Sequence, residues 1–338
     1  VQDAEENGQH LVVLKARGKG YSYKTASMLN RNFFLVEDSK SYAIASEMEF
    51  LTKDGILTKA WDMMDFIDEH TAWTKKRQRV DTKMHKRASY ITDSDGTKVE
   101  VGYKSEIIGI TLKNDPQKAR GKRGKLILWE EAGKFPGLLA AWQVARPSVE
   151  QGGKAYGLMI AFGTGGTEEG DYGSLKELFY KPKAYNCLEV RNIWDTGADN
   201  TACGFFVPAY VNMDTDHMDD QGNSLIPEAK RFVLAEREKV EINANDKSSV
   251  DRYIAEQPFT PMEATLQLSG NIFPKKDLAV HLARIQTDTS LFNYKQVGDL
   301  VFDEGGNLKW VPTKKQRDIV KFPLDRTDDK TGSIVIWE

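Results

Sequence analysis

The chain has 338 residues, of which 40% are hydrophobic and 29% charged, and its formal net charge at pH 7 is −3. This is the composition of a soluble globular protein with about two domains, and it excludes a polyanion binder of strongly basic overall charge. No apolar run approaches the roughly 18 residues that span a bilayer, and no secretory signal opens the chain. The two cysteines, Cys187 and Cys203, provide no disulfide framework or metal-ligand spacing, so we expect a reducing, cytoplasmic setting.

Predicted strands and helices alternate along the first part of the chain. Apolar runs predict strands at residues 11–16, 41–46, 126–129, 156–162 and 185–190. A helical spacing of apolar residues predicts helices at residues 21–35, 47–70 and 138–149. Alternating polarity in residues 88–112, with Asp95-Gly96 as the turn, predicts a β-hairpin. Continuous apolar strands separated by helices are typical of a parallel sheet with helices on both faces, so we expect an α/β fold.

The character of the sequence changes near residue 210. Charged helices are predicted at residues 226–240, 248–257 and 275–287. A hairpin is predicted at residues 298–312, and a separate apolar strand at residues 332–338. We interpret the acidic stretch 212–224 as a solvated loop. The chain is therefore divided into a core of residues 1–210 and a smaller α+β subdomain of residues 211–338. Because the last residues form an apolar strand, we expect the native protein to continue beyond them.

A strand, glycines and a helix start follow one another in "LVVLKARGKGYSYKTA" (Leu11–Ala26), which is the order of a phosphate-binding loop. The usual loop ends in Gly-Lys-[Ser/Thr], but here Tyr21 stands at the lysine position. Two registers are open. The first ends in Gly20-Tyr21-Ser22, and the second runs from Gly18 to Lys24-Thr25. We favour the first because it keeps the glycine that lets the backbone approach a phosphate. Ser22 is then the expected Mg²⁺ ligand, with Thr25 as its rival.

Two further strands end in residues that suit a nucleotide site. The run "KLILWEE" (Lys125–Glu131) places Glu130 where a P-loop ATPase holds Mg²⁺, and Glu131 where it polarises the attacking water. The run "GLMIAF" (Gly157–Phe162) leads into Gly163-Thr164. Since ligands bind at the carboxyl edge of open α/β sheets, the Thr164 hydroxyl is expected there as a γ-phosphate sensor. Two basic runs, Lys75–Arg87 and Lys113–Lys125, are candidates for phosphate contacts or for solvated faces.

The order of "ARGKGYS", "ARGKRGKLILWEEAGKF" and "IAFGTGG" resembles the ATPase domain of the large terminase subunit of tailed bacteriophages, over roughly residues 11–178. The resemblance implies a P-loop NTPase fold of the ASCE type, with ATP and Mg²⁺ as cofactors. Lambda-type members share the Ala-Arg pair followed by Gly-Tyr-Ser, with lysines displaced to the ends of the loop. On this resemblance the nucleotide-binding residues are Lys15, Arg17, Gly18, Lys19, Gly20, Tyr21, Ser22, Lys24 and Thr25.

The same resemblance implies further residues and partners. Arg120 matches an arginine that completes a neighbouring subunit's site, and Arg146 is an alternative only because it is basic and close in sequence. The implied partners are double-stranded DNA, a portal protein, a small terminase subunit and further copies of the chain in a ring, without a membrane. The implied location is the host cytoplasm, docked transiently on a procapsid. The segment "PFTPMEATLQLSGNIFP" (Pro258–Pro274) is similar to the stretch that joins the motor to a nuclease, and nuclease activity is not expected from this chain.

The sequence also departs from the family in places. Glu130 replaces the usual Asp, the phosphate-facing lysine is unassigned among Lys15, Lys19 and Lys24, and only ten residues precede the first strand. The expected function is a motor ATPase that translocates double-stranded DNA into a procapsid. A helicase-like or recombination ATPase is the enzyme alternative, although residues 210–338 show no second ATPase-like alternation. An inactive P-loop scaffold or portal-docking protein is the alternative without enzyme activity.

Overall fold

The computed structural model describes residues 1–113, 115–165, 172–198, 201–213, 215–244, 247–265, 295–303, 305–313 and 334–337. The chain forms two compact units, the first of residues 1–195 and 199–275 and the second of residues 196–198 and 276–338. No helix in the described ranges combines the length and the apolar character needed to cross a membrane.

A mostly parallel sheet of eight strands forms the centre of the first unit, in the order β14-β1-β11-β8-β2-β7-β4-β3. Its strands are β1 (Leu11–Lys15), β2 (Lys40–Ala45), β3 (Val80–Asp81), β4 (His85–Arg87), β7 (Glu106–Thr111), β8 (Leu126–Trp129), β11 (Leu158–Thr164) and β14 (Phe205–Val207). From β14 to β7 all neighbours are parallel, and β4 and β3 extend the sheet antiparallel at one side. The predicted P-loop-type α/β fold is confirmed.

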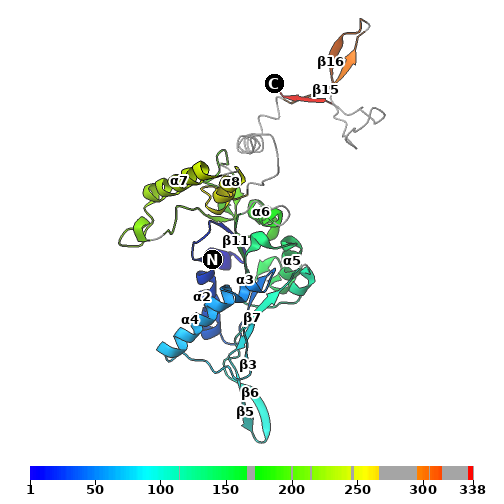
Figure 1. The fold of residues 1–338 in the computed structure, drawn as a ribbon. Coiled ribbons are helices and arrows are strands. Elements are labelled where there is room, and N and C mark those ends of the chain that lie inside the picture. The colour runs from blue at the N-terminus through cyan, green and yellow to red at the C-terminus, as the bar shows by residue number, and fades with distance from the viewer. Residues whose placement is uncertain are drawn as a thin grey trace. The chain divides into compact units, whose positions relative to one another are not determined.

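Helices cover both faces of this sheet (Figure 1). Helices α2 (Tyr21–Leu35) and α4 (Ile56–His70) pack together on one face, and α5 (Leu138–Ala145) and α6 (Tyr172–Tyr180) pack together on the other. Because successive strand residues point to opposite faces, Val12 and Leu14 of β1 join the core beneath α5 and α6. Leu11 and Val13 join the core beneath α2 and α4. Burial on both faces explains why these strands are continuous apolar runs.

Several predicted elements are shorter or different in the structure. The helix expected over residues 47–70 is two helices, α3 (Glu49–Thr52) and α4. The break is local: Asp54 has φ 59°, and a Cβ on Gly55 would lie 2.2 Å from the Phe50 carbonyl oxygen. The strand expected at residues 185–190 is wrong. The chain there leaves a 3-10 turn, η4 (Pro182–Tyr185), forms an isolated parallel bridge between Cys187 and His10, and then pairs through β12 (Val190–Arg191) with β13 (Ala202–Cys203).

The predicted hairpin at Asp95-Gly96 is present as β5 (Tyr90–Ser94) and β6 (Thr97–Val101), and it projects from the unit. The predicted helices near residues 226–240 and 248–257 are α7 (Ile226–Asn243) and α8 (Lys247–Glu256), followed by α9 (Pro261–Ala264). The remaining short elements are α1 (Gln2–Asn7), η1 (Pro116–Ala119), η2 (Ala132–Lys134), η3 (Arg146–Ser148), β9 (Glu150–Gln151), β10 (Lys154–Ala155) and η5 (Thr215–His217).

The second unit contains a three-stranded antiparallel sheet in the order β16-β15-β17. Strand β15 (Lys295–Phe302) pairs with β16 (Leu308–Pro312) as the predicted hairpin, and its other side pairs with β17 (Ile334–Trp337), the predicted terminal strand. The helix expected at residues 275–287 lies outside the described residues.

Candidate active site at the carboxyl edge of the sheet

The loop between β1 and α2 has the backbone geometry that its glycines suggested. Gly18 and Gly20 have φ of 77° and 65°, which favour glycine, and a Cβ at either position would meet nothing within 4 Å. The backbone conformation, not lack of space, therefore requires glycine here. Helix α2 begins at Tyr21, directly after Gly20, as the first register predicted. The backbone N–H groups at the start of a 15-residue helix provide an anion-binding position next to this loop.

Tyr21 is a core residue. Its ring is buried, lies 5.3 Å from the Phe162 ring between centroids, and belongs to the core beneath α2. Burial raises the pKa of its hydroxyl to about 12. The sequence position is that of the usual lysine, but the side chain points into the core.

The three displaced lysines have different surroundings. Lys15, the last residue of β1, is buried; desolvation lowers its pKa, and the nearby carboxylates of Glu131 and Glu130 oppose that shift. The Lys19 ammonium donates to the Ala209 carbonyl at 2.6 Å. Lys24 is exposed, with its ammonium 5.2 Å from the centre of the Tyr21 ring. Of the three, Lys15 is the one whose charge is held beside the acid pair.

The acid pair follows β8 directly. One carboxylate oxygen of Glu130, Oε1, accepts a hydrogen bond from the Ser22 hydroxyl at 3.0 Å. The other, Oε2, is buried with no hydrogen-bond partner in the described structure. Burial, followed by the charge of Glu131, raises the pKa of Glu130 to about 8. Glu131 has φ 48°, a conformation uncommon for a residue with a side chain, where the chain turns into η2.

Thr164 completes the group at this edge. It is buried at the end of β11 and pairs in register with Lys15 of β1, and β11 lies between β1 and β8. A Cβ on Gly163 would lie 2.8 Å from the backbone nitrogen of Gly133, so the end of β11 packs closely against the turn after Glu131. Parallel strands thus bring Lys15, Glu130 and Thr164 to one edge of the sheet.

Two other loop residues have structural contacts. The Thr25 hydroxyl donates to the carbonyl oxygens of Tyr21 at 3.0 Å and Ser22 at 3.1 Å, and it is buried within α2. Ser22, in contrast, directs its hydroxyl to Glu130. The guanidinium of Arg17 lies 3.2 Å from the Glu256 carboxylate.

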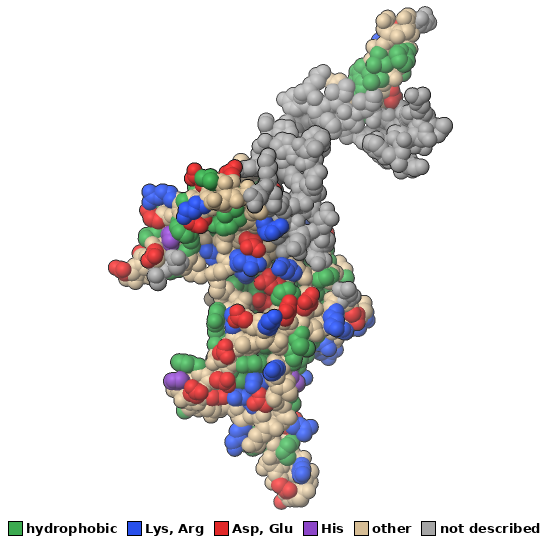
Figure 2. Space-filling model, viewed as in Figure 1, with side chains coloured by type: hydrophobic (Ala, Val, Ile, Leu, Met, Phe, Trp, Pro, Cys, Tyr) green, Lys and Arg blue, Asp and Glu red, His purple; other side chains and the backbone are tan. Residues whose placement is uncertain are grey.

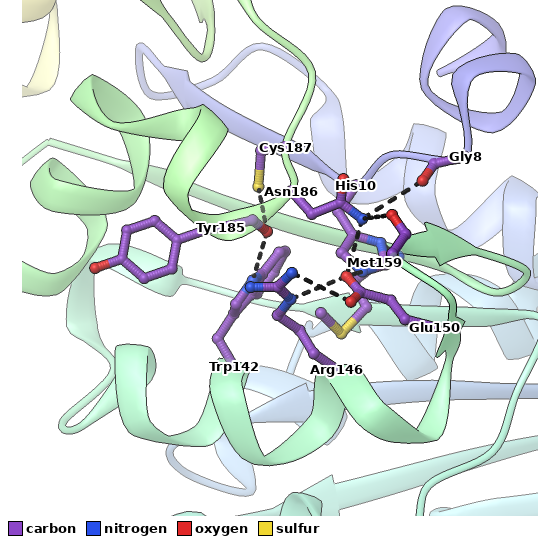
Figure 3. Close-up of polar contacts among 10 residues, drawn as sticks. Gly8, His10, Trp142, Arg146, Glu150, Met159, Tyr185, Asn186 and Cys187 are labelled. Atoms are coloured by element: carbon purple, nitrogen blue, oxygen red, sulfur yellow. Dashed lines mark hydrogen bonds and ion pairs between the residues drawn. The ribbon is translucent and has the colours of Figure 1, made fainter.

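The two arginines considered for a neighbouring site differ clearly. Arg120 is exposed, and its guanidinium donates only to the Gln117 side chain among the described residues, at 2.8 and 3.1 Å. Arg146 donates to the Glu150 carboxylate at 2.9 and 3.2 Å, within the polar network drawn in Figure 3. That network contains His10 at the amino end of β1, so it lies at the opposite edge of the sheet from Lys15.

The two basic runs also differ. In the first, Arg77 pairs with Asp68 at 2.5 Å, Lys86 with Asp81, and Arg87 with Glu100 and Glu106 at 2.8 and 3.0 Å. The described part of the second run contains the basic residues Lys113, Lys118, Arg120, Lys122, Arg123 and Lys125. None of these six forms an ion pair with a described residue. Acidic and basic side chains are interspersed over the face seen in Figure 2.

Sequence reasoning missed the residues that hold the phosphate loop from outside. The loop backbone contacts Glu256 and Gln257 at the end of α8, and Lys19 contacts Ala209. The segment from Pro258 onward was noted only for its resemblance. The contact of Gln257 with Arg17, 240 residues away in the chain, has no local signal.

Neither a family model nor a curated protein sequence matches the chain. Its fold is similar to the ATPase domain of the Thermus phage P74-26 large terminase, with a TM-score of 0.50 and 12% identity over 75% of this chain and 88% of that one. A mutant of that domain has a TM-score of 0.49 and 13% identity over 74% of this chain and 89% of that one. The HK97 bacteriophage large terminase has a TM-score of 0.39 and 15% identity over 70% of this chain and 45% of that one. At such identities the likeness concerns the fold, and the chain has the P-loop-type α/β fold of a large terminase ATPase domain.

Proposed function

We propose that the chain is the ATPase motor of a viral terminase, which hydrolyses ATP to translocate double-stranded DNA into a procapsid. One observation carries the proposal: a glycine loop, a buried lysine and a buried, incompletely paired carboxylate meet at the carboxyl edge of a P-loop-type sheet. The fold likeness to a terminase ATPase domain supports the choice among P-loop ATPases.

The residues at this edge fit Mg²⁺. Glu130 offers the buried oxygen without a hydrogen-bond partner, and the Ser22 hydroxyl lies beside it; both are the hard oxygen ligands that Mg²⁺ prefers. A divalent cation would also favour the ionised form of Glu130, which burial disfavours. When bound, the ion would neutralise charge on the phosphates of ATP. Ser22 and Glu130 would hold it.

We assign the phosphate-facing charge to Lys15. Its ammonium is held beside the acid pair, whereas that of Lys19 is bound to the Ala209 carbonyl and that of Lys24 lies on the surface. The loop at Gly18 and Gly20 and the first N–H groups of α2 would cradle the phosphates. A charge that faces the γ-phosphate stabilises the transition state more than the ground state, so Lys15 is expected to act on turnover more than on binding.

Glu131 is proposed as the base that orients and deprotonates the attacking water, and Thr164 as the residue that senses the γ-phosphate. Arg120 is exposed, with its guanidinium bound to the Gln117 side chain, and is proposed to reach the site of a neighbouring copy in a ring, where it stabilises transition-state charge. The second basic run would contact DNA phosphates without reading bases. A portal protein and a small terminase subunit are the further proposed partners.

ATP turnover by the purified chain with Mg²⁺, measured with and without double-stranded DNA, tests the proposal. We expect turnover that depends on Mg²⁺ and rises with DNA, and that is lost in Glu131→Gln. If the folded chain neither binds nor hydrolyses ATP under either condition, the motor function is excluded and the scaffold alternative is favoured. Turnover that is independent of Glu131 would exclude this site.

A further inference from the structure

A short segment far along the chain contacts the phosphate loop through its backbone. The segment runs from Glu256, at the end of α8, to Ala264 of α9, and is called the connector here. The Arg17 N–H donates to the Glu256 carbonyl at 2.9 Å, and the Gln257 side-chain amide donates to the Arg17 carbonyl at 3.4 Å. Both backbone groups of Arg17, in the middle of the loop, are therefore paired with the connector.

A second path joins the connector to the same loop. The Pro258 carbonyl accepts a hydrogen bond from the Ala209 N–H at 2.8 Å. The Ala209 carbonyl in turn accepts one from the buried Lys19 ammonium at 2.6 Å. Asn212, close to Ala209 in the chain, donates to the Lys19 carbonyl at 3.3 Å. The connector thus holds the two loop residues that flank Gly18.

The connector also packs against the turn that follows Thr164. A Cβ on Gly165 would lie 2.1 Å from the Ala264 carbonyl oxygen and 2.8 Å from that of Ala255. These are backbone atoms, so only glycine fits unless α9 moves. The residue that follows the proposed γ-phosphate sensor and the phosphate loop therefore both lie against the connector.

One partly buried ion pair fixes the shape of the connector. Arg237 of α7 donates to the two carboxylate oxygens of Glu263 at 2.7 and 3.2 Å, and also to the Gln257 carbonyl at 2.7 Å. Glu263 also accepts from the Phe259 N–H at 2.7 Å, and the Arg237 guanidinium lies 4.2 Å from the centre of the Phe259 ring. Only 13% and 19% of the two charged side chains are exposed, and a bidentate pair of this kind is geometrically strict.

We propose that Arg237 and Glu263 are positioning residues, which set the conformation of the phosphate loop by holding the connector. They lie on α7 and α9, and Gln257, which Arg237 binds, is the residue that binds Arg17. The effect on the loop follows from contacts within the chain alone. The effect on catalysis rests on the proposed function.

The test is Arg237→Gln, compared with Arg231→Gln on the same helix. Arg231 forms an exposed pair with Glu228 at 2.9 Å and is the matched control. Hydrogen exchange of peptides that cover residues 15–20 is measured well below the melting temperature, without nucleotide. We expect about tenfold faster exchange in Arg237→Gln and parental exchange in Arg231→Gln, because the Arg17 amide is released when the connector loosens. Affinity for Mg²⁺-ATP should fall about tenfold in Arg237→Gln only.

Two results would overturn the proposal: parental exchange of the loop in folded Arg237→Gln, or exchange that rises equally in β1, β2 and β8, since a merely structural role loosens the whole sheet. Glu263→Gln, which keeps an oxygen for the Phe259 N–H, is the second variant if Arg237→Gln does not fold, and the same two results apply to it. If the parent binds no ATP, the proposed function fails, while loop exchange still decides the role of Arg237 and Glu263.

Discussion

The two ends of β1 each lie beside a glutamate, partly buried Glu150 at the amino end and buried Glu130 at the carboxyl end, and the two carboxylates differ in their partners. At the amino end, Glu150 accepts hydrogen bonds from Arg146 and Asn186 and lies 2.9 Å from His10, and these partners lower its pKa to about 2 despite burial (Figure 3). At the carboxyl end, Glu130 accepts a hydrogen bond from the Ser22 hydroxyl and from no other described residue, and burial raises its pKa to about 8.

This difference separates a structural site from the proposed functional one. A buried charge with a full set of partners stabilises the fold and leaves no position for a ligand. A buried charge with an unfilled partner destabilises the free protein, and such groups gather where a ligand supplies the missing partner. We therefore expect changes at the carboxyl edge to affect turnover, and changes at the amino edge to affect stability.

The largest expected effect is that of Glu131→Gln. The variant should lower ATP turnover by orders of magnitude and leave ATP binding nearly intact, because only the activation of water is removed. Single-turnover hydrolysis and equilibrium binding of ATP measure the two quantities. Turnover within about twofold of the parent would remove Glu131 from the role of base.

The second largest effect is expected from Lys15→Ala. ATP turnover should fall by roughly two orders of magnitude, and ATP affinity should fall less. Lys24→Ala, on the exposed surface, is the matched control and should behave like the parent. Tyr21→Phe should have a mild effect, since the ring packs against Phe162 and remains in place. A turnover defect confined to Lys24→Ala would favour the second register of the loop instead.

Arg120 and Arg146 extend the comparison to two arginines: Arg120 forms no ion pair with a described residue, and Arg146 is paired with Glu150. Mixing Arg120→Ala with Glu131→Gln should recover part of the ATPase activity, because a mixed interface joins an intact base to an intact arginine. Arg146→Ala should lower the melting temperature instead, since it removes two hydrogen bonds from Glu150. Mixtures shown to co-assemble but without recovered activity would contradict a role for Arg120 between subunits.

Much of the fold was predictable because its signals are local. Continuous apolar runs marked β1, β8 and β11, and the glycines before Tyr21 marked the loop and the start of α2. The three-residue β14 has no periodicity to detect, and the break at Gly55 depends on a close approach to Phe50. The burial of Tyr21 and of Lys15 depends on distant parts of the chain. Sequence alone therefore named the lysines but could not choose between them.

A smaller effect is expected from Glu150→Gln at the amino edge. It should destabilise the chain by about 2 kcal/mol, since hydrogen bonds to a charged group are lost and Arg146 keeps a weaker partner. Chemical denaturation measures the free energy of unfolding. ATP affinity of the folded variant should equal that of the parent. A loss of affinity without a loss of stability would show that this edge is not merely structural.

The smallest expected effect concerns pH and His10. Its Nδ1 accepts the Met159 N–H at 3.2 Å, and desolvation lowers its pKa, so the folded chain resists protonation more than the unfolded chain does. The contribution of neutral His10 is present above the unfolded pKa near 6.5 and is lost as pH falls below it. His10→Gln should flatten the fall in the free energy of unfolding between pH 7 and pH 5, by at most about 1.4 kcal/mol per pH unit.

The contrast between the two edges is tested most directly by the unfolding free energy of nucleotide-free Lys15→Met. Methionine fills the volume of the lysine stem and carries no charge into the buried position, where desolvation disfavours the ammonium. We predict that this variant is at least as stable as the parent, because the Lys15 charge is held for a ligand and not for the fold. A loss of stability as large as that of Glu150→Gln would contradict this, and Lys15 would then be a structural residue like those around His10.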